Sequence, residues 1–294
     1  MDAHEHLQLL KRQERLLALR ACILDAVTPG SRVLDAGCGS GVLSVWAAQA
    51  GASEVVAVDT EAIPIAEALA RENGVDGQVR FLERDLLALE PEEVGSFDVI
   101  LGLLYLNDPR RDREQAKLVE LIRKRFLAPG GRLLPDSVRH TGRLVDWPTQ
   151  DHLARRAAIS IEAADIERGI GLSLRELAEA ASSGVSLAWF PPKNAGRYAT
   201  DGYREVSQVF LLEEIDYSHA LPDRPESLEL VASAPGRATA IIWTQYLCSS
   251  GRELFVNESL SWVENPTAVD HGSLVRLEFG PQWAASNVVR LEPA

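Results

Sequence analysis

The sequence has little cysteine and no long hydrophobic run. Its three cysteines, Cys22, Cys38 and Cys248, are odd in number and far apart. This spacing argues against a disulfide framework and predicts no metal site, and it favours a reducing compartment. No run of about 20 apolar residues is present, so we expect no membrane partner and no membrane span. The charged start of the chain is unlike a signal peptide. We therefore expect a cytoplasmic protein.

Positive charge is also scarce. The chain has 43 acidic and 30 basic residues, for a formal net charge of −13. Proteins that bind nucleic acids usually present a basic surface, so we expect no DNA or RNA partner. The remaining composition, 46% hydrophobic and 25% charged, is that of an ordinary globular protein and is sufficient for a core.

The pattern of the chain changes near residue 138. Residues 1–27 are rich in helix formers and carry a stripe of leucines at helical spacing. Over residues 28–138 short apolar runs alternate with helical patterns, which predicts an α/β fold with a parallel sheet. Residues 139–294 are β-rich, with short alternating segments between proline, glycine and asparagine, apart from a helical stretch that begins near residue 150.

The most informative stretch is V-L-D-A-G-C-G-S-G, residues 33–41. Gly37, Gly39 and Gly41 follow an apolar run and precede an amphipathic one, so a strand is expected to end in a glycine-rich turn that opens a helix. Such a turn exposes backbone N–H groups, and the missing Cβ atoms let a ligand approach closely. Asp59 ends the next apolar run, where a carboxylate suits the two hydroxyl groups of a ribose. The pattern predicts a ligand that contains adenosine.

Two features distinguish the ligand from a dinucleotide. The dinucleotide fingerprint G-x-G-x-x-G requires a glycine where Val42 stands. Asp35, just before the turn, would repel a pyrophosphate but can accept a hydrogen bond from an ammonium group. Both features favour S-adenosylmethionine (SAM), which has an amino-acid end and no phosphate. The alternatives are a purely structural turn and an NAD site.

The same residues resemble a known family. V-L-D-A-G-C-G-S-G resembles motif I of class I SAM-dependent methyltransferases, and V-V-A-V-D, which ends at Asp59, resembles their ribose-binding strand. The resemblance implies that Asp85, in R-F-L-E-R-D, holds the adenine amino group. The helix after motif I and the stretch 126–138, F-L-A-P-G-G-R-L-L-P-D-S-V, resemble the protein arginine methyltransferase branch. In that branch an arginine of an upstream helix reaches the cofactor carboxylate, and the matching residue is Arg15.

The resemblance also implies an architecture. It predicts a Rossmann-like SAM-binding parallel sheet domain over residues 28–138, with residues 1–27 completing the cofactor site. A β-barrel-like domain for substrate and dimerisation would follow over residues 139–294. Its helical arm, at about 150–200, is expected to mediate a homodimer. The resemblance covers the first 138 residues well and the remainder only in outline.

The sequence departs from that branch in two places. Arginine methyltransferases carry a two-glutamate loop after F-D-V-I, because a guanidinium stays charged and two carboxylates can hold it toward the sulfonium methyl group. In this chain Leu103 stands at the first glutamate, and Glu114 lies within a residue of the second. Tyr105 lies near the family's tyrosine. The T-H-W motif of the branch is not evident.

An apolar Leu103 suits an apolar or neutral acceptor. We therefore predict a SAM-dependent methyltransferase of a small molecule, for example an N- or C-methylated indole in secondary metabolism (natural-product biosynthesis). Glu114 is the candidate base, Tyr105 is the candidate for orienting the acceptor, and His140 is a further residue that could face the site. Two alternatives remain open. One is a protein arginine N-methyltransferase with a divergent loop, and the other is a catalytically silent SAM-binding partner subunit.

Overall fold

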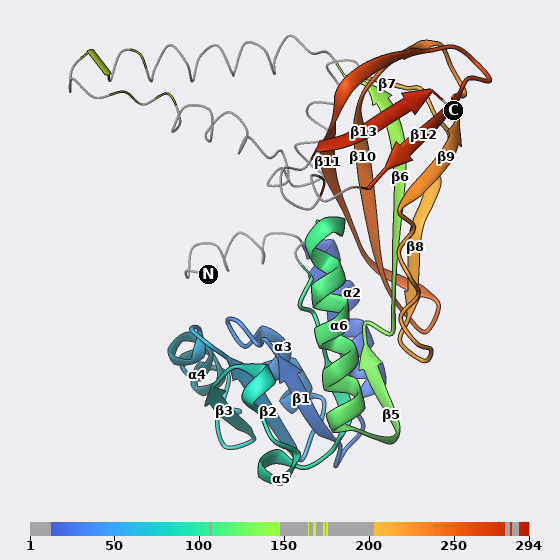
Figure 1. Ribbon diagram of the computed structural model, residues 1–294. Helices are drawn as coiled ribbons and strands as arrows, with labels where there is room; N and C mark the ends of the chain where they lie inside the picture. The colour runs from blue at the N-terminus through green and yellow to red at the C-terminus, as the bar shows by residue number, and fades with distance from the viewer. Residues whose placement is uncertain are drawn as a thin grey trace.

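The computed structural model describes residues 13–105, 108–147, 203–279 and 288–293, together with Ala164, Glu167, Arg168, Ser173, Arg175 and Trp283. The predicted arm at about 150–200 therefore lies almost entirely outside the described residues. Two sheets, which the chain forms one after the other, account for most of the described part (Figure 1). None of the helices in these ranges is long and apolar enough to cross a membrane.

The first unit is a parallel sheet with helices on both faces. The strand order is β3-β2-β1-β4-β5, with all neighbours parallel. The order reverses between β1 and β4, so their carboxyl ends form the kind of crevice in which α/β sheets bind ligands. In chain order the elements are α2 (Gln13–Ala26), β1 (Arg32–Ala36), α3 (Val42–Gln49), β2 (Glu54–Asp59), α4 (Ile63–Glu72), β3 (Val79–Glu83), η1 (Leu86–Ala88), α5 (Pro91–Val94), β4 (Phe97–Leu101), α6 (Pro109–Phe126) and β5 (Leu127–Leu134).

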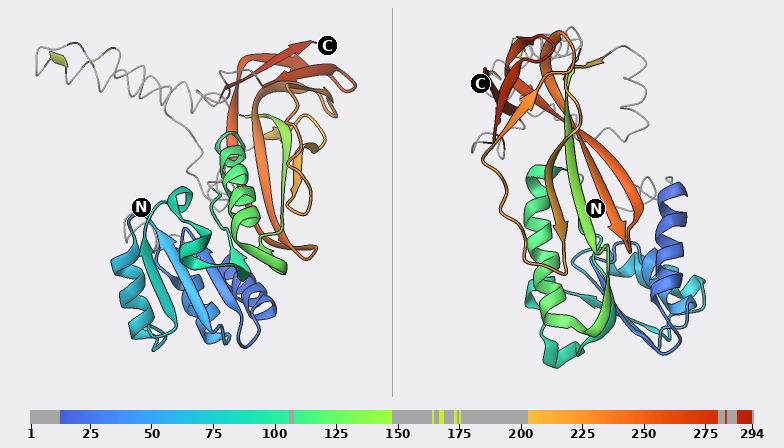
Figure 2. Two further views of the ribbon diagram at one scale, coloured as in Figure 1. Left: turned by 60° about the horizontal axis from the view of Figure 1, so that its bottom comes forward. Right: turned by 90° about the vertical axis from the view of Figure 1, so that its right-hand side faces the viewer.

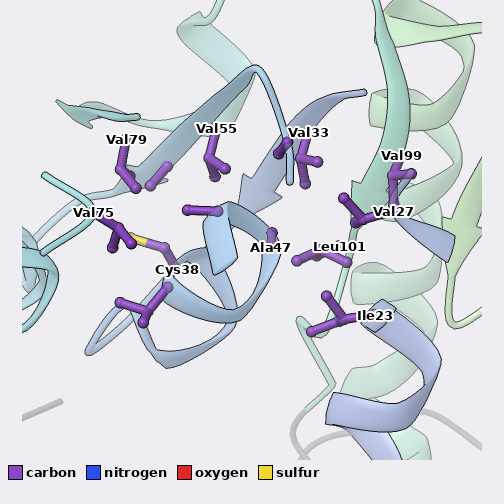
Figure 3. Close-up of a cluster of buried hydrophobic side chains, with 14 of the residues drawn as sticks. Ile23, Val27, Val33, Cys38, Ala47, Val55, Val75, Val79, Val99 and Leu101 are labelled. Atoms are coloured by element: carbon purple, nitrogen blue, oxygen red, sulfur yellow. The ribbon is translucent and has the colours of Figure 1, made fainter. Parts of the chain in front are cut away.

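The central strands of this sheet are continuous apolar runs because helices cover both of its faces. Val33 of β1 belongs to the buried cluster on the face of α2 and α3, whereas its neighbour Leu34 belongs to the cluster on the face of α6. Figure 3 shows the first cluster, in which Ile23 of α2 lies near Leu101 of β4. The N-terminal helix is thereby held against the sheet that carries the predicted cofactor residues.

The second unit is a curled sheet that forms a half-barrel (Figures 1 and 2). Its strand order is β7-β6-β10-β11-β13-β12-β9, and β8 pairs with β6. Its core surrounds the fully buried Trp243. A Rossmann-like parallel sheet followed by a barrel-like sheet confirms the predicted fold class. The strands are β6 (Ser137–Asp146), β7 (Arg204–Glu205), β8 (Phe210–Asp216), β9 (Ser227–Val231), β10 (Gly236–Ser249), β11 (Arg252–Val269), β12 (Leu274–Glu278) and β13 (Val288–Pro293).

The buried side of β6 is apolar near both ends of the strand and polar between them. Val138 of β6 belongs to the apolar core that also contains one side of α6, and Leu144, farther along β6, belongs to the core of the half-barrel. Between them lies a buried polar band made by His140, Gln245 and Glu213. Asp112 of α6 contacts Gln245 of β10 and His140 of β6, so this band lies where the two units meet.

Candidate active site

The glycine turn adopts the conformation that the motif requires. Gly37, Gly39 and Gly41 all have positive φ, at 73°, 54° and 80°. The backbone N–H of Gly37 donates to Val58 O at 2.8 Å, which fixes the turn to the end of β2. Gly41 caps α3, where an added Cβ would lie 2.9 Å from the Cβ of Ala66. The turn therefore forms a bare backbone surface between the ends of β1 and β2.

Asp35 is a buried acid at the end of β1. Its side chain is 1% exposed, and one oxygen accepts a hydrogen bond from Ser44 Oγ at 2.6 Å. Burial raises the pKa of Asp35 to about 6, the Ser44 hydrogen bond opposes that rise, and the charge of Asp59 adds to it. A cationic group beside this carboxyl would favour its ionised form. The ammonium of an amino acid provides such a charge, so the site fits the amino-acid end of SAM.

Asp59, at the end of β2, remains ionised. Its carboxylate accepts hydrogen bonds from the backbone N–H groups of Gly39, Glu61 and Ala62, at 2.9, 3.1 and 3.3 Å. Burial acts to raise the pKa of Asp59, but these hydrogen bonds outweigh it and hold the pKa below its ordinary value. The side chain is half-buried rather than enclosed. A fixed carboxylate at this position is a suitable acceptor for ribose hydroxyls.

The structure places the other two predicted cofactor residues on flanking elements. Asp85 is exposed and caps η1 by accepting from the backbone N–H of Leu87 at 2.9 Å. It comes two residues after Glu83, which pairs with Asp59 across the β2–β3 ladder, so both acids lie at one edge of the sheet. Arg15 is half-buried on α2, the helix that packs on α3. The donor set as a whole fits SAM, and the assignment of each role remains a prediction.

Residues 102–108 connect β4 with α6, and we call this segment the acceptor loop, of which residues 102–105 and 108 are described. Leu104 of this loop lies on the glycine turn. A Cβ added to Gly37 would lie 2.5 Å from Leu104 Cδ2, so this side chain covers the turn. Tyr105 is half-buried, and its hydroxyl hydrogen-bonds that of Tyr217, just beyond β8. Burial raises the pKa of Tyr105 well above its ordinary value, so its hydroxyl stays neutral.

Glu114 lies on the outer side of α6. Its side chain is 70% exposed, and its carboxylate pairs with Lys117 Nζ at 2.6 Å. Asp112, half a turn earlier in the helix, is instead completely buried. The structure thus places the predicted base near the start of α6 in contact with solvent, and its catalytic role stays a prediction.

Three buried polar residues beside the acceptor loop were not predicted. They are Asp112, Glu213 and Gln245, and His140 lies among them. One available signal was Gln245, because it interrupts the apolar run A-I-I-W-T-Q-Y-L. Asp112 gave no such signal, because it lies in a charged stretch that is typical of a solvated surface, and Glu213 lies in a segment that the sequence predicted only as part of the β-rich region.

Comparison with known proteins identifies the first unit. Residues 33–131 match the family model described as "Methyltransferase domain". Protein arginine N-methyltransferase 1 of Dictyostelium discoideum is 34% identical over 140 residues, which cover 45% of this chain. The match spans only 39% of that relative's length.

Solved structures extend the likeness over nearly the whole chain. Protein arginine methyltransferase 10 of Arabidopsis thaliana covers 94% of this chain, with 87% of its own chain, at a TM-score of 0.64 and 18% identity. The enzyme–prozyme complex of Trypanosoma brucei PRMT1 with AdoHcy covers 94%, with 88% of its own chain, at a TM-score of 0.63 and 19% identity. At these identities the likeness shows the fold, and AdoHcy is the demethylated product of SAM.

These findings contradict the predicted small-molecule acceptor, and with it the indole. The relative and the two structures above are protein arginine methyltransferases, which favours the first alternative of the sequence analysis. The prediction was wrong because it inferred the acceptor mainly from Leu103, a local departure from the two-glutamate loop, whereas the similarity to protein arginine methyltransferases extends beyond that loop. Residues 33–131 match a methyltransferase domain, and the chain is similar in sequence over 140 residues and in fold to protein arginine methyltransferases.

Proposed function

We propose that the protein transfers the methyl group of SAM to an arginine side chain of a protein. The observation that carries the proposal is the assembled edge of the sheet. There Asp35 and Asp59 flank the glycine turn, and Leu104 of the acceptor loop lies on that turn. The similarity to protein arginine methyltransferases supports the choice of acceptor.

The cofactor site is proposed residue by residue. Asp35 binds the ammonium group, Asp59 the ribose hydroxyls, Asp85 the adenine amino group and Arg15 the carboxylate. The backbone of Gly37, Gly39 and Gly41 leaves room for the ligand between them. SAM supplies a methyl group on a positively charged sulfur, which is open to in-line attack. The protein's contribution is then mainly to hold the attacking nitrogen about 3–3.5 Å from that carbon.

The acceptor side must hold a cation. A guanidinium has a pKa above about 12 and needs carboxylates to bind it and to take its proton. Glu114 is the proposed carboxylate for the proton, because it lies at the start of α6 and is accessible to solvent. The neutral hydroxyl of Tyr105 orients the acceptor without competing for the proton. The net charge of −13 attracts arginine-rich segments.

One observation favours a second candidate, a SAM-binding partner subunit without turnover. Leu103 replaces the first glutamate of the two-glutamate loop, which removes one carboxylate from the acceptor side. The Trypanosoma brucei structure is of an enzyme–prozyme heterotetrameric complex.

For assembly, we propose a homodimer formed by the arm at about 150–200.

The first experiment combines binding with turnover. Calorimetry with SAM and with its demethylated product is followed by a methyl-transfer assay on a glycine/arginine-rich peptide, with the lysine-substituted peptide as control. We expect binding of both ligands and transfer to the arginine peptide alone. Binding without transfer would support the partner subunit, and transfer to the lysine peptide would contradict the arginine assignment.

Glu114→Gln tests the proposed base. We expect kcat for the arginine peptide to fall at least about tenfold, with the affinity for SAM unchanged, because only proton removal is affected. The control is Glu72→Gln, which makes the same chemical change at an exposed glutamate of α4. Equal activities of the two variants would remove Glu114 from the mechanism.

A further inference from the structure

We infer that a buried polar cluster at the junction of α6 and the half-barrel positions the acceptor loop. This deepens the proposed function and rests on it for the identity of the acceptor. We call the set the junction cluster. Its members are Asp112, Arg113, His140, Glu213, Arg224 and Gln245. None of them belongs to the cofactor edge described above, so they act through the loop rather than on SAM.

Asp112 ties the first turn of α6 to the half-barrel. Its side chain is completely buried, and Oδ2 accepts from the backbone N–H of Asp108 at 3.0 Å. The same oxygen accepts from Nε2 of Gln245 on β10 and lies 3.6 Å from Nε2 of His140 on β6. One carboxylate thus connects the last residue of the acceptor loop with two strands of the other unit.

Glu213 enters the cluster from β8, on the inward side that also buries Ile215 and Tyr217, and a bulge lies next to it in the pairing with β6. The register against β6 places Glu213 opposite His140 and Leu211 opposite Thr141, so Leu212 is the extra residue. Leu212 and Glu213 are both buried, whereas Glu214 is exposed. A bulge changes which side chains face inward, and bulges are frequent beside active sites. Glu213 Oε1 lies 3.3 Å from His140 Nδ1.

Two arginines connect Glu213 with the start of α6. Arg224 donates to the Glu213 carboxylate and, at 2.6 Å, to the carbonyl of Pro109, the first residue of the helix. Arg113 lies 3.3 Å from Glu213 Oε2 and also donates to the carbonyl of Pro222. The two arginines therefore hold Glu213 and the segment that follows β8 against the start of α6.

The acceptor loop is consequently tied to β8 and the residue that follows it at two points. Tyr105, at the middle of the loop, hydrogen-bonds Tyr217 just beyond β8. Asp108, at its end, is held by Asp112, and the cluster links Asp112 through His140 to Glu213 of β8. A displacement of β8 would therefore disturb both contacts of the loop.

A purely stabilising role does not account for these charges. Burying an ion is costly, and apolar residues of similar size often serve stability as well or better. Apolar cores already lie on both sides of the band. Burial acts to lower the pKa of His140, but its interactions with Asp112 and Glu213 outweigh this and raise it. Directional contacts fix a relative position that an apolar contact would leave free to slide.

The test compares two adjacent glutamates, Glu213→Gln and Glu214→Gln. The chemical change is the same, but only the first lies in the cluster. The readout is hydrogen exchange of the peptide 102–112, which needs no acceptor. We expect Glu213→Gln to accelerate exchange there at least about tenfold, while exchange of the peptide 33–41 and the affinity for SAM stay within about twofold. Glu214→Gln should behave as the unmodified protein does.

A second variant protects the test against misfolding. His140→Gln keeps a polar side chain of similar reach and should produce the same local acceleration. Unchanged exchange in both variants would overturn the inference, and so would acceleration throughout the chain, because the cluster would then be merely structural.

Turnover distinguishes the inference from the proposed function. If the unmodified protein methylates the arginine peptide, Glu213→Gln should lower kcat at least about tenfold and leave the KM for SAM unchanged. An unmodified protein without turnover, combined with local acceleration in the variants, would reject the proposed function while supporting the positioning of the loop.

Discussion

At the scale of single residues, Asp35 shows how a ligand site lowers the stability of the empty fold. Its pKa is about 6 in the folded protein and ordinarily 3.8. A carboxyl whose folded pKa lies above its unfolded pKa stabilises the fold fully below the unfolded value. That contribution is lost as the pH rises through the folded value. Near neutral pH the raised pKa of Asp35 therefore lowers the free energy of unfolding by up to about 3 kcal/mol.

Asp35→Asn should therefore stabilise the ligand-free protein while it weakens SAM binding. At about pH 7.5 we expect the free energy of unfolding to rise by roughly 1–3 kcal/mol, and at about pH 4 the gain should vanish. Urea unfolding at the two pH values and calorimetry with SAM measure both effects.

The exposed Asp76→Asn is the control for that measurement, because it makes the same chemical change without burial. A less stable Asp35→Asn protein at both pH values would contradict the account of Asp35.

Asp35 was predictable from the sequence because its role follows from its place just before the turn. Asp112 was not, because burial of an acid in a charged helix depends on what packs against that helix.

At the scale of elements, the strand–turn–helix unit of β1 and α3 depends on the conformation of its glycines. Gly41 has a φ of 80° and leaves no room for a side chain beside Ala66. Gly74, after α4, has a similar φ of 68° but open space around it. Substitutions at the two positions can therefore distinguish the cost of backbone strain from the cost of steric exclusion.

Gly41→Ala should destabilise the protein by about 3 kcal/mol, through backbone strain together with the contact with Ala66. Gly74→Ala should cost about 1 kcal/mol, because only the left-handed conformation is penalised. Chemical denaturation of both variants measures the difference. Equal losses would show that the helix start tolerates a methyl group at Gly41.

At the scale of the whole molecule, two units meet around α6 and share one apolar core. Ile122 of α6 and Leu247 of β10 belong to the same buried cluster, and α2 also contacts β11. The acceptor loop lies at this junction, and the chain as a whole is strongly acidic. A basic substrate segment would therefore be attracted before it makes any specific contact.

The KM for an arginine-rich peptide should accordingly rise with salt. Between about 0.05 and 0.5 M salt we expect an increase of roughly fivefold, because the screening length falls to a few ångström. The KM for SAM should change less, since its site depends on short-range contacts. Steady-state kinetics with the basic peptide and with a version flanked by acidic residues measures this. A KM that does not depend on salt would argue against attraction by the net charge.

The Rossmann-like sheet, the glycine turn and the choice of SAM could be inferred from the amino-acid order alone. Their signals are local, because Asp35, the turn and Asp59 lie within 25 residues of one another. The half-barrel could be inferred only as a β-rich pattern.

The junction cluster depended on the tertiary structure. Gln245 meets Asp112 across 133 residues and His140 across 105. The pairing of β8 with β6 then places Glu213 opposite His140, where it is buried, and leaves Glu214 exposed. Contacts across such separations depend on the register between strands and on how the two units dock. A local sequence pattern contains information on neither the register nor the docking. The burial of these acids could therefore not be predicted from the sequence.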